Sequence, residues 1–359
     1  MITRIKSIHF YRAISPLSRP IADATHTISE IAFVITRIEL ESGIIGESNL
    51  LAFHYSPGAI AGALRDIAPV AMEFDAWQTG HFLERAAAEG EYFGNKGINR
   101  WAAGAINVAM WDAWARTLGQ PVWKLFGAHR DKVPVYGSGG WLSYSIEELI
   151  DEVIGYVRRG LTAVKIKVGS PDLQRDLERI ARVREAIGTS VKLLIDANQG
   201  MTVAAAMELA QSARQYNLHC FEEPVANTDF DGYAHLRRHC GIGLAMGERE
   251  YDTVALRELI ARNALDLWQP DILRLGGVEG WRASALLAHG SGLRVAPHYY
   301  KEYDVALLCT IPTGYCCESF EGIDALIDTP IEIRDGFAHP RPTPGWGFRF
   351  KDEYLTELA

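Results

Sequence analysis

Three short apolar runs decide the fold of this chain: Val191–Asn198 (VKLLIDAN), Leu218–Pro224 (LHCFEEP) and Ile242–Glu248 (IGLAMGE). Each run carries an acidic residue at its end, and these residues, Asp196, Glu222 and Glu248, lie 26 positions apart along the chain. A (β/α)8 barrel repeats one strand and one helix every ~25–35 residues and builds its active site at the carboxyl ends of the strands. The spacing therefore predicts that three carboxylates converge at the mouth of a barrel.

The same rhythm extends to both sides of these runs. Further apolar strand candidates are Val133–Ser138, Ala163–Gly169, Leu265–Asp271, Leu293–His298 and Thr313–Glu318, and stretches with helical periodicity separate most of them. The clearest helix is expected between Ser170 as its cap, Pro171 at its first position and Gly188 at its end. Eight strand candidates with intervening helices predict a parallel α/β barrel.

The residues before the barrel follow a different pattern. Ile28–Leu40 alternates in hydrophobicity and is followed by the turn Glu41-Ser42-Gly43, which predicts antiparallel strands. Helical patterns follow and end near Gly119 and Pro121. We therefore expect an α+β capping domain over residues 1–125, a barrel with the active site over 126–324, and a return to the capping domain over 325–359.

Composition excludes several function classes. The formal net charge of −9, without a Lys/Arg cluster, argues against a nucleic-acid partner. No apolar run approaches the ~20 residues that span a bilayer, and the start lacks a signal-peptide pattern. The five cysteines have no CxxC spacing, so we expect buried thiols in a cytoplasmic protein.

The strand candidate Ala163–Gly169 carries two lysines, Lys165 and Lys167. Side chains alternate along a strand, so both ammonium groups point to one face, about 6–7 Å apart. The three carboxylates supply the anions that two lysines inside a barrel require. Crowding by Lys165 and a metal predicts a depressed pKa for Lys167, which makes it a candidate base. The alternative is a pair of structural salt bridges at the rim.

Carboxylates without Cys or His among them suit Mg²⁺ with positions left open for a substrate. Three further polar residues end predicted strands: Asp271, His298 and Glu318. An Asp one strand away from a His fixes its tautomer and raises its basicity. Glu318 either donates a proton as a neutral acid or pairs with a lysine.

In combination, the Lys-Ile-Lys strand, the three carboxylates, the Asp–His pair and the last Glu closely resemble the enolase superfamily in its mandelate racemase subgroup. The helix Ala105–Gly127 resembles the junction between cap and barrel in that superfamily, and the resemblance covers nearly the whole chain. It implies a (β/α)7β modified TIM barrel with an α+β capping domain, and an assembly into homo-oligomers, either dimers or octamers.

The resemblance also implies roles for individual residues. Asp196, Glu222 and Glu248 would bind Mg²⁺, and a Lys or His base acts with Mg²⁺ on an ene-diolate. Lys165 would contact the substrate carboxylate, Lys167 would be a base, and Glu318 would be a hydrogen-bonding electrophile. Asp271 and His298 would form the second acid–base pair. Asn198 lies on the same face as the first ligand and is a candidate substrate contact.

Polar residues in the expected lid indicate a polyhydroxylated substrate. Candidate contacts with hydroxyls or a distal carboxylate are Arg19, Asp23, His26, His54 and Tyr55, joined by Ser138 at the end of the first barrel strand. Lys301 either binds a distant carboxylate or is a surface lysine. The segments PIADA (20–24), SGGW (138–141) and APHYYKE (296–302) resemble galactarate/talarate-type acid-sugar dehydratases.

The resulting functional hypothesis is Mg²⁺-dependent removal of the proton α to a carboxylate, followed by dehydration of a sugar acid (hexarate or hexonate) to a 2-keto-3-deoxy acid. A 2-hydroxy-acid racemase or epimerase would use the same residues. A muconate-type cycloisomerase and a non-enzymatic binding barrel are the remaining alternatives. The expected partner is a small-molecule carboxylate, with neither nucleic acid nor membrane.

Overall fold

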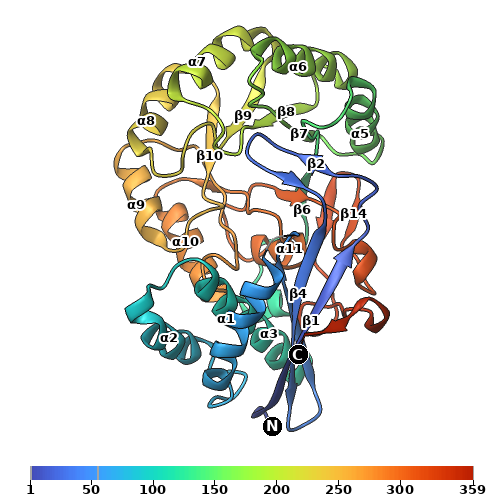
Figure 1. Ribbon diagram of the computed structural model, residues 1–359, viewed down its shortest axis with the longest axis vertical. Coiled ribbons are helices and arrows are strands. Elements are labelled where there is room, and N and C mark those ends of the chain that lie inside the picture. Colours follow the sequence, from blue (N-terminus) through green and yellow to red (C-terminus); the bar gives the residue numbers. More distant parts are fainter. Residues whose placement is uncertain (1, 55, 359) are drawn as a thin grey trace.

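The computed structural model describes residues 2–54 and 56–358 and shows a barrel whose open end is covered by a capping domain (Figure 1). In Figure 1 the cap, drawn in blue and teal, lies below the barrel. The hairpin of β2 (Ile21–Ala22) and β3 (Thr27–Ile28) reaches from the cap onto the barrel, where Leu142 N donates to Ala22 O over 2.8 Å.

The capping domain is built on an antiparallel sheet packed against helices. The strand order is β16-β1-β4-β5. Gly46 in β5 allows the longest helix of the cap, α3, to pack directly on the sheet, because a Cβ there would lie 2.2 Å from Ala109 O. The elements are β1 (Ile5–Ser15), β4 (Ile31–Leu40), β5 (Ile45–Leu51), β16 (Thr356–Glu357), α1 (Pro57–Ala71), α2 (Thr79–Gly90), η1 (Glu91–Phe93), α3 (Ile98–Thr117) and α4 (Val122–Leu125).

The barrel contains eight parallel strands. Neighbouring strands pair from β6 to β12, β13 pairs with β6, and a bridge between Val295 and Gly314 links β12 to the segment before β13. The strands are β6 (Val133–Ser138), β7 (Ala163–Lys167), β8 (Lys192–Asp196), β9 (Leu218–Glu222), β10 (Gly243–Met246), β11 (Leu267–Trp268), β12 (Arg294–Val295) and β13 (Cys317–Ser319).

Seven α-helices connect these strands in the described part of the barrel, which confirms the predicted (β/α)7β fold. They are α5 (Ile146–Arg158), α6 (Leu173–Ile187), α7 (Val203–Ser212), α8 (Phe230–His239), α9 (Thr253–Ala261), α10 (Val278–Gly290) and α11 (Lys301–Leu308), with η2 (Arg214–Tyr216) after α7. Helix α6 begins two residues later than predicted, because the Asp172 side chain, and not Ser170, accepts from the backbone N of Gln174.

The chain after the barrel divides between the two domains. The hairpin of β14 (Glu332–Arg334) and β15 (Phe337–His339) extends the barrel sheet, because β15 pairs antiparallel with β6. In contrast, β16 pairs with β1 in the cap. The short helix η3 (Asp324–Leu326) precedes β14, and η4 (Asp352–Tyr354) lies between β15 and β16.

Two further expectations concern the chain as a whole. All five cysteines are buried and free, as predicted. Among the described residues, no helix is long and apolar enough to cross a membrane.

Candidate active site

A cavity of about 110 Å³ lies where the carboxyl ends of the barrel strands meet the capping domain. Its floor comes from the barrel, and its roof comes from the β2–β3 hairpin and the end of β5. The residues predicted from the sequence that line this cavity are Asp23, His26, Ser138, Lys165, Lys167, Asn198, Glu248, His298 and Glu318. Asp196, Glu222 and Asp271 lie directly behind them, within hydrogen-bond reach of the lining lysines and histidine.

Strand β7 places both lysines on the inner face of the barrel, where carboxylates from other strands pair with them. Lys165 is 1% exposed, and its Nζ lies 2.7 Å from Glu222 Oε1 and 2.8 Å from Glu318 Oε1. Lys167 Nζ lies 2.6 Å from Asp196 Oδ2. Because a buried charge is tolerated only when it is paired, these ion pairs explain why the strand retains two lysines.

The pKa of Lys167 shifts in the direction opposite to the sequence-based expectation. Burial acts to lower this pKa, but the Asp196 carboxylate outweighs burial and raises it above the ordinary lysine value. Lys165 does act to lower it, as expected, but that effect is smaller than the attraction to Asp196. Lys167 therefore becomes a base only when Asp196 is drawn away from its ammonium group.

The three carboxylates predicted to bind a metal come from β8, β9 and the segment after β10, and all are buried. Burial raises the pKa of Glu222 to about 8, and repulsion from the Asp196 carboxylate adds to this rise. The second oxygen of Glu222 accepts from Gln269 Nε2 over 2.6 Å. Such a concentration of buried negative charge favours a bound cation.

The donor set fits Mg²⁺ by chemistry, because it consists of hard oxygen atoms. Beside it, the Asn198 Oδ1 atom is buried without a hydrogen-bond partner. In the arrangement seen here, Asp196 and Glu222 turn toward lysines, and Glu248 lies 3.5 Å from both Arg249 and His298. No three His, Cys, Asp or Glu side chains within residues 2–54 and 56–358 are grouped as a metal site in this arrangement. The ligand assignment therefore stays a prediction.

His298 faces the cavity from the opposite side of the barrel to the lysines. Strands β7 and β12 are separated by β6 and β13 in the barrel order. His298 Nδ1 lies 3.0 Å from Asp271 Oδ2, and the other oxygen of Asp271 accepts from the backbone N of Leu273 and Arg274. Because Asp271 is fixed in this way, it holds the imidazole ring and leaves Nε2 toward Glu248 and the cavity.

Burial acts to lower the pKa of His298, but the carboxylates of Glu248 and Asp271 outweigh burial and raise it. This agrees with the expectation that the aspartate increases the basicity of the ring. The imidazole is therefore suited to accept a proton on one face of a bound substrate.

Glu318 is the partner of a lysine and not a neutral acid in this arrangement. Its Oε2 accepts from the backbone N of Tyr299 over 2.8 Å, and the Ser138 hydroxyl is a second hydrogen-bond partner. Burial acts to raise its pKa, but Lys165 and then His298 outweigh burial and lower it to about 2. Of the two alternatives left open by the sequence, the structure therefore favours pairing with Lys165.

Two predicted substrate contacts do not reach the cavity. Arg19 Nη2 lies 2.6 Å from Glu148 Oε2, and its guanidinium stacks over the Tyr144 ring. Lys301 is not a surface residue, since it is 2% exposed and its Nζ lies 2.7 Å from Asp324 Oδ2. In this arrangement each charge is paired outside the cavity, and a contact of either residue with substrate stays a prediction.

The other two predicted lid residues are His54 and Tyr55. His54 does not line the cavity, and its Nδ1 lies 3.4 Å from the backbone N of Ser29. Tyr55 lies outside the described residues.

Three charged residues of the site, Glu223, Arg249 and Arg274, were not predicted from the sequence. Arg249 Nε donates to Glu223 Oε2 over 2.9 Å, and Arg274 Nη1 donates to the carbonyl of Glu248 over 2.6 Å. Both arginines line the cavity. A signal was present, because Glu223 and Arg249 each directly follow a predicted ligand, and Arg274 lies three residues after Asp271.

The roof of the cavity is less polar than the lid predicted from the sequence. Apolar or aromatic side chains line it, and the polar residues there are Asp23 and His26. Phe53 has a backbone φ of 49°, an unusual value for a non-glycine residue. The apolar residues of the roof are Ile28, Leu51 and Phe53, whereas the aromatic residues Trp141, Tyr299 and Phe320 line the barrel side of the cavity.

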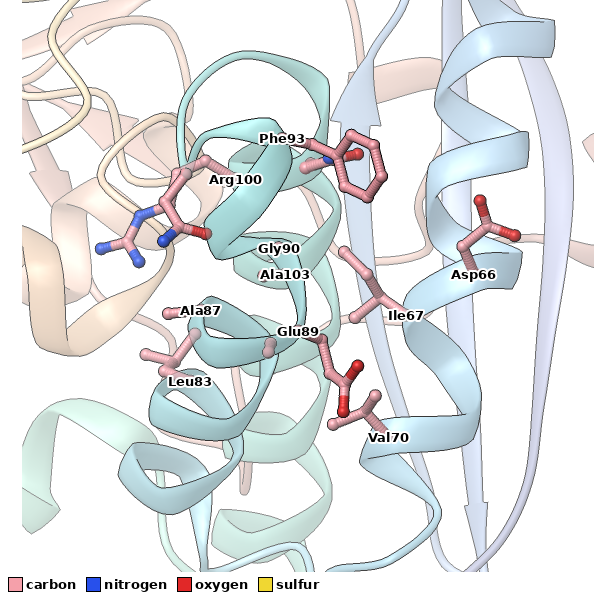
Figure 2. A pocket seen from close by; sticks show the side chains of 13 residues that line it. Asp66, Ile67, Val70, Leu83, Ala87, Glu89, Gly90, Phe93, Arg100 and Ala103 are labelled. Atoms are coloured by element: carbon pink, nitrogen blue, oxygen red, sulfur yellow. The ribbon is translucent and has the colours of Figure 1, made fainter.

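A second cavity, of about 270 Å³, lies within the capping domain between α1, α2 and α3 (Figure 2). Its charged residues are Asp66, Glu89 and Arg100. Figure 2 shows the Arg100 guanidinium directed away from both carboxylates, and its Nη2 donates to Leu275 O over 2.8 Å. The cavity does not combine a base with a group that stabilises negative charge, so the barrel mouth is the candidate active site.

Comparisons with known proteins identify the family of the chain. The family model of the mandelate racemase/muconate lactonizing enzyme N-terminal domain matches residues 7–127, and the enolase C-terminal domain-like model matches residues 148–354. The L-talarate/galactarate dehydratase of Salmonella typhimurium is 30% identical, over 98% of this chain and 90% of its own length. The 3,6-anhydro-alpha-L-galactonate cycloisomerase of Streptomyces coelicolor is 29% identical, over 100% of this chain and 99% of its own.

Solved structures give the same result. The Salmonella typhimurium L-talarate/galactarate dehydratase liganded with Mg and L-lyxarohydroxamate has a TM-score of 0.93 and 29% identity. The match covers 99% of this chain and 94% of that one. The fold therefore matches along nearly the whole length of both chains.

Proposed function

Because the chain belongs to the mandelate racemase/muconate lactonizing enzyme family of the enolase superfamily, we propose that it dehydrates a sugar acid to a 2-keto-3-deoxy acid with the help of Mg²⁺. One observation carries this proposal. Lys167 and His298, each oriented by its own carboxylate, face one cavity from opposite sides of the barrel, beside three further buried carboxylates. This arrangement suits removal of a proton from a carbon atom next to a carboxylate.

The residues that would hold Mg²⁺ are Asp196, Glu222 and Glu248. A proton α to a carboxylate is very weakly acidic, because its removal places a second negative charge on that carboxylate. The chemistry that Mg²⁺ supplies when bound is stabilisation of this charge on the substrate oxygens. Lys165 adds a buried positive charge to the same end of the cavity, where low exposure to water strengthens the interaction.

Two bases on opposite faces also provide for elimination. One base takes the proton from C2, which gives an enediolate. As the enediolate collapses, the carboxylate at C1 re-forms, the electron pair between C1 and C2 makes a C2=C3 double bond, and the C3–OH bond breaks. The conjugate acid of the other base gives its proton to the departing hydroxyl, which leaves as water. The resulting enol takes up a proton at C3 and loses the proton of its C2 hydroxyl, which gives the 2-keto-3-deoxy acid. No redox partner is needed.

A racemase of a 2-hydroxy acid is the second candidate function, and the apolar roof of the cavity favours it. Ile28, Leu51 and Phe53 would contact an apolar substituent without leaving polar groups unpaired. Deprotonation on one face and reprotonation on the other uses the same two bases. The difference between the two functions is then the presence of a hydroxyl group that can leave from C3.

The test is incubation of the Mg²⁺-loaded protein with a library of sugar acids, with detection of 2-keto-3-deoxy products. We expect dehydration of at least one C5 or C6 acid, with activity lost after complete chelation of the metal and restored by added Mg²⁺. Mandelate and a muconate lactone serve as comparison substrates. Efficient mandelate racemisation without any sugar-acid dehydration would establish the second candidate, and full activity after exhaustive chelation would contradict the assigned use of Mg²⁺.

A further inference from the structure

From the distribution of charge in the cavity we infer that the substrate is a monocarboxylate sugar acid, an aldonate, in preference to the dicarboxylate aldarate of the same configuration. This inference rests on the proposed dehydration and adds the class of substrate. An aldarate places a second carboxylate at the end of the molecule farthest from the reacting carbon, and an aldonate places a neutral hydroxymethyl group there. The question is therefore which of these two groups fits the side of the cavity formed by the capping domain, which we call the far wall.

The positive charges of the cavity all lie at its barrel end. Lys165 and Lys167 belong to the reacting end, and their ammonium groups already pair with carboxylates. Arg249 is held by Glu223 at 2.9 Å, and Arg274 is held by the carbonyl of Glu248 at 2.6 Å. Within the described chain, no Lys or Arg from the capping domain lines this cavity.

The cap side instead presents a carboxylate. Asp23 lies in the β2–β3 hairpin, lines the cavity, and has a side chain that is 7% exposed. Its Oδ1 accepts from the backbone N of Thr25 and of His26, each over 2.7 Å, so the carboxylate has a defined position. Those contacts engage one oxygen of Asp23, and its position in the wall suits it to accept a hydrogen bond from a substrate hydroxyl.

His26 is the other polar residue that the capping domain contributes to this wall. Its Nδ1 lies 3.4 Å from Asp23 Oδ1 and 2.7 Å from Thr25 Oγ1. The imidazole is therefore already engaged by Asp23 and Thr25 within the protein. The rest of the roof consists of apolar side chains, including Ile28, Leu51 and Phe53.

The two cations outside the cavity that the sequence suggested as substrate contacts are paired elsewhere. Arg19 lies 2.6 Å from Glu148, and Lys301 lies 2.7 Å from Asp324. A second carboxylate on the substrate would thus lose water, face Asp23, and find no cationic partner. A hydroxymethyl group keeps its hydrogen bond with Asp23. An unpaired charged group at such a site weakens binding by about tenfold or more.

The test compares matched acids on the Mg²⁺-loaded protein: gluconate with glucarate, and galactonate with galactarate. Calorimetry gives the Kd of each acid, and product formation gives kcat/KM. In at least one pair we expect kcat/KM for the aldonate to exceed that for the aldarate by about tenfold or more, mainly because KM is lower for the aldonate. Asp23→Asn keeps an oxygen that accepts the hydrogen bonds within the β2–β3 hairpin but removes the negative charge, so it should reduce the preference for the aldonate over the aldarate. Glu30→Gln is the control: it removes a negative charge outside the cavity and should leave this preference unchanged.

The possible outcomes distinguish a failure of the aldonate preference from a failure of the proposed dehydration. If an aldarate is bound and dehydrated as well as its aldonate partner, the inference is overturned while the proposed dehydration stands. If the aldonate preference persists unchanged in Asp23→Asn, the assignment to the far-wall charge is wrong. If no acid of either kind binds or reacts, the proposed function fails and the inference fails with it.

Discussion

At the scale of single residues, the pairing of Arg249 with Glu223 shows how the mouth of the barrel tolerates extra negative charge. Glu223 is fully buried, and burial raises its pKa to about 8, with repulsion from Glu248 adding to the rise. Arg249 opposes this shift by donating to Glu223 over 2.9 Å while lying 3.5 Å from Glu248. One guanidinium therefore compensates two carboxylates.

Replacing Arg249 by Met should leave the Glu223 carboxylate buried without its partner. Loss of one partner of a fully buried pair costs roughly 3–5 kcal/mol, and because Arg249 is partly exposed we expect a loss of about 2 kcal/mol in the free energy of unfolding. Urea denaturation measures this loss. The double variant Arg249→Met with Glu223→Gln should recover more than half of it, and an equal loss in both variants would show that charge is not the cause.

The positions of the catalytic candidates and the pair of Asp271 with His298 could be predicted from the sequence, whereas the particular carboxylate that each lysine contacts could not. Strand alternation alone places Lys165 and Lys167 on one face. The pairing of Lys167 with Asp196 depends on the register between β7 and β8, where the two residues lie opposite each other. That register is a three-dimensional property, so the direction of the Lys167 pKa shift was beyond the reach of sequence reasoning.

At the scale of elements, two tyrosines beside and within α11 hold the roof of the cavity to the barrel. The backbone N of Leu51 donates to the Tyr300 hydroxyl over 3.1 Å, and the backbone N of Asn49 donates to the Tyr303 hydroxyl over 3.1 Å. The Tyr303 hydroxyl in turn donates to the Asn49 side chain. These contacts fix the last residues of β5, which lead directly to Phe53 in the cavity wall.

Tyr300→Phe should loosen the end of β5 and leave the Leu51 N–H without its acceptor. We expect a loss of about 1 kcal/mol in the free energy of unfolding. We also expect KM for the sugar acid to rise severalfold while kcat changes less, because the hydroxyl touches the roof and not the reacting atoms. Steady-state kinetics and urea denaturation test this. Tyr92→Phe is the control, since Tyr92 is 87% exposed; an unchanged KM in Tyr300→Phe would contradict the assigned role.

The order of elements could be predicted well because β strands and helices leave different hydrophobic periods in the sequence. The boundaries of the elements and their pairing partners were harder to predict from the sequence. The β14–β15 hairpin pairs with β6 of the barrel, which no local pattern in residues 325–359 reveals. Likewise, Asp172 and Ser170 are both suitable helix caps, and the choice between them depends on the path of the loop.

At the scale of the whole molecule, one histidine at the end of the barrel opposite to the active site couples stability to pH. Burial lowers the pKa of His219 from 6.5 to about 4, and the positive charges of Lys192 and Arg294 add to this effect. The ring is therefore neutral in the folded protein at pH values where it is protonated in the unfolded chain. Between these two pKa values the unfolded state binds more protons, so stability falls as the pH falls from about 6.5 toward 4.

His219→Gln should reduce this part of the pH dependence. Because His219 is only partly buried, solvent screening limits the effect, and we expect a contribution of ~1 kcal/mol. The measurement is the difference in unfolding free energy between pH 7.5 and pH 5, compared for the wild type and the variant, since other groups titrate equally in both. An identical pH dependence in the two proteins would rule out His219 as the source.

The central claim is that Lys167 and His298 act on opposite faces of one substrate carbon, and proton exchange in D₂O tests it most directly. Proton NMR would follow the C2–H signal of two sugar acids that differ only in configuration at C2, with the Mg²⁺-loaded wild type, Lys167→Ala and His298→Asn. We predict that each variant still exchanges the proton of one epimer and fails with the other, and that the two variants show opposite choices. Loss of exchange with both epimers in both variants, while Mg²⁺ still binds, would contradict the two-face arrangement.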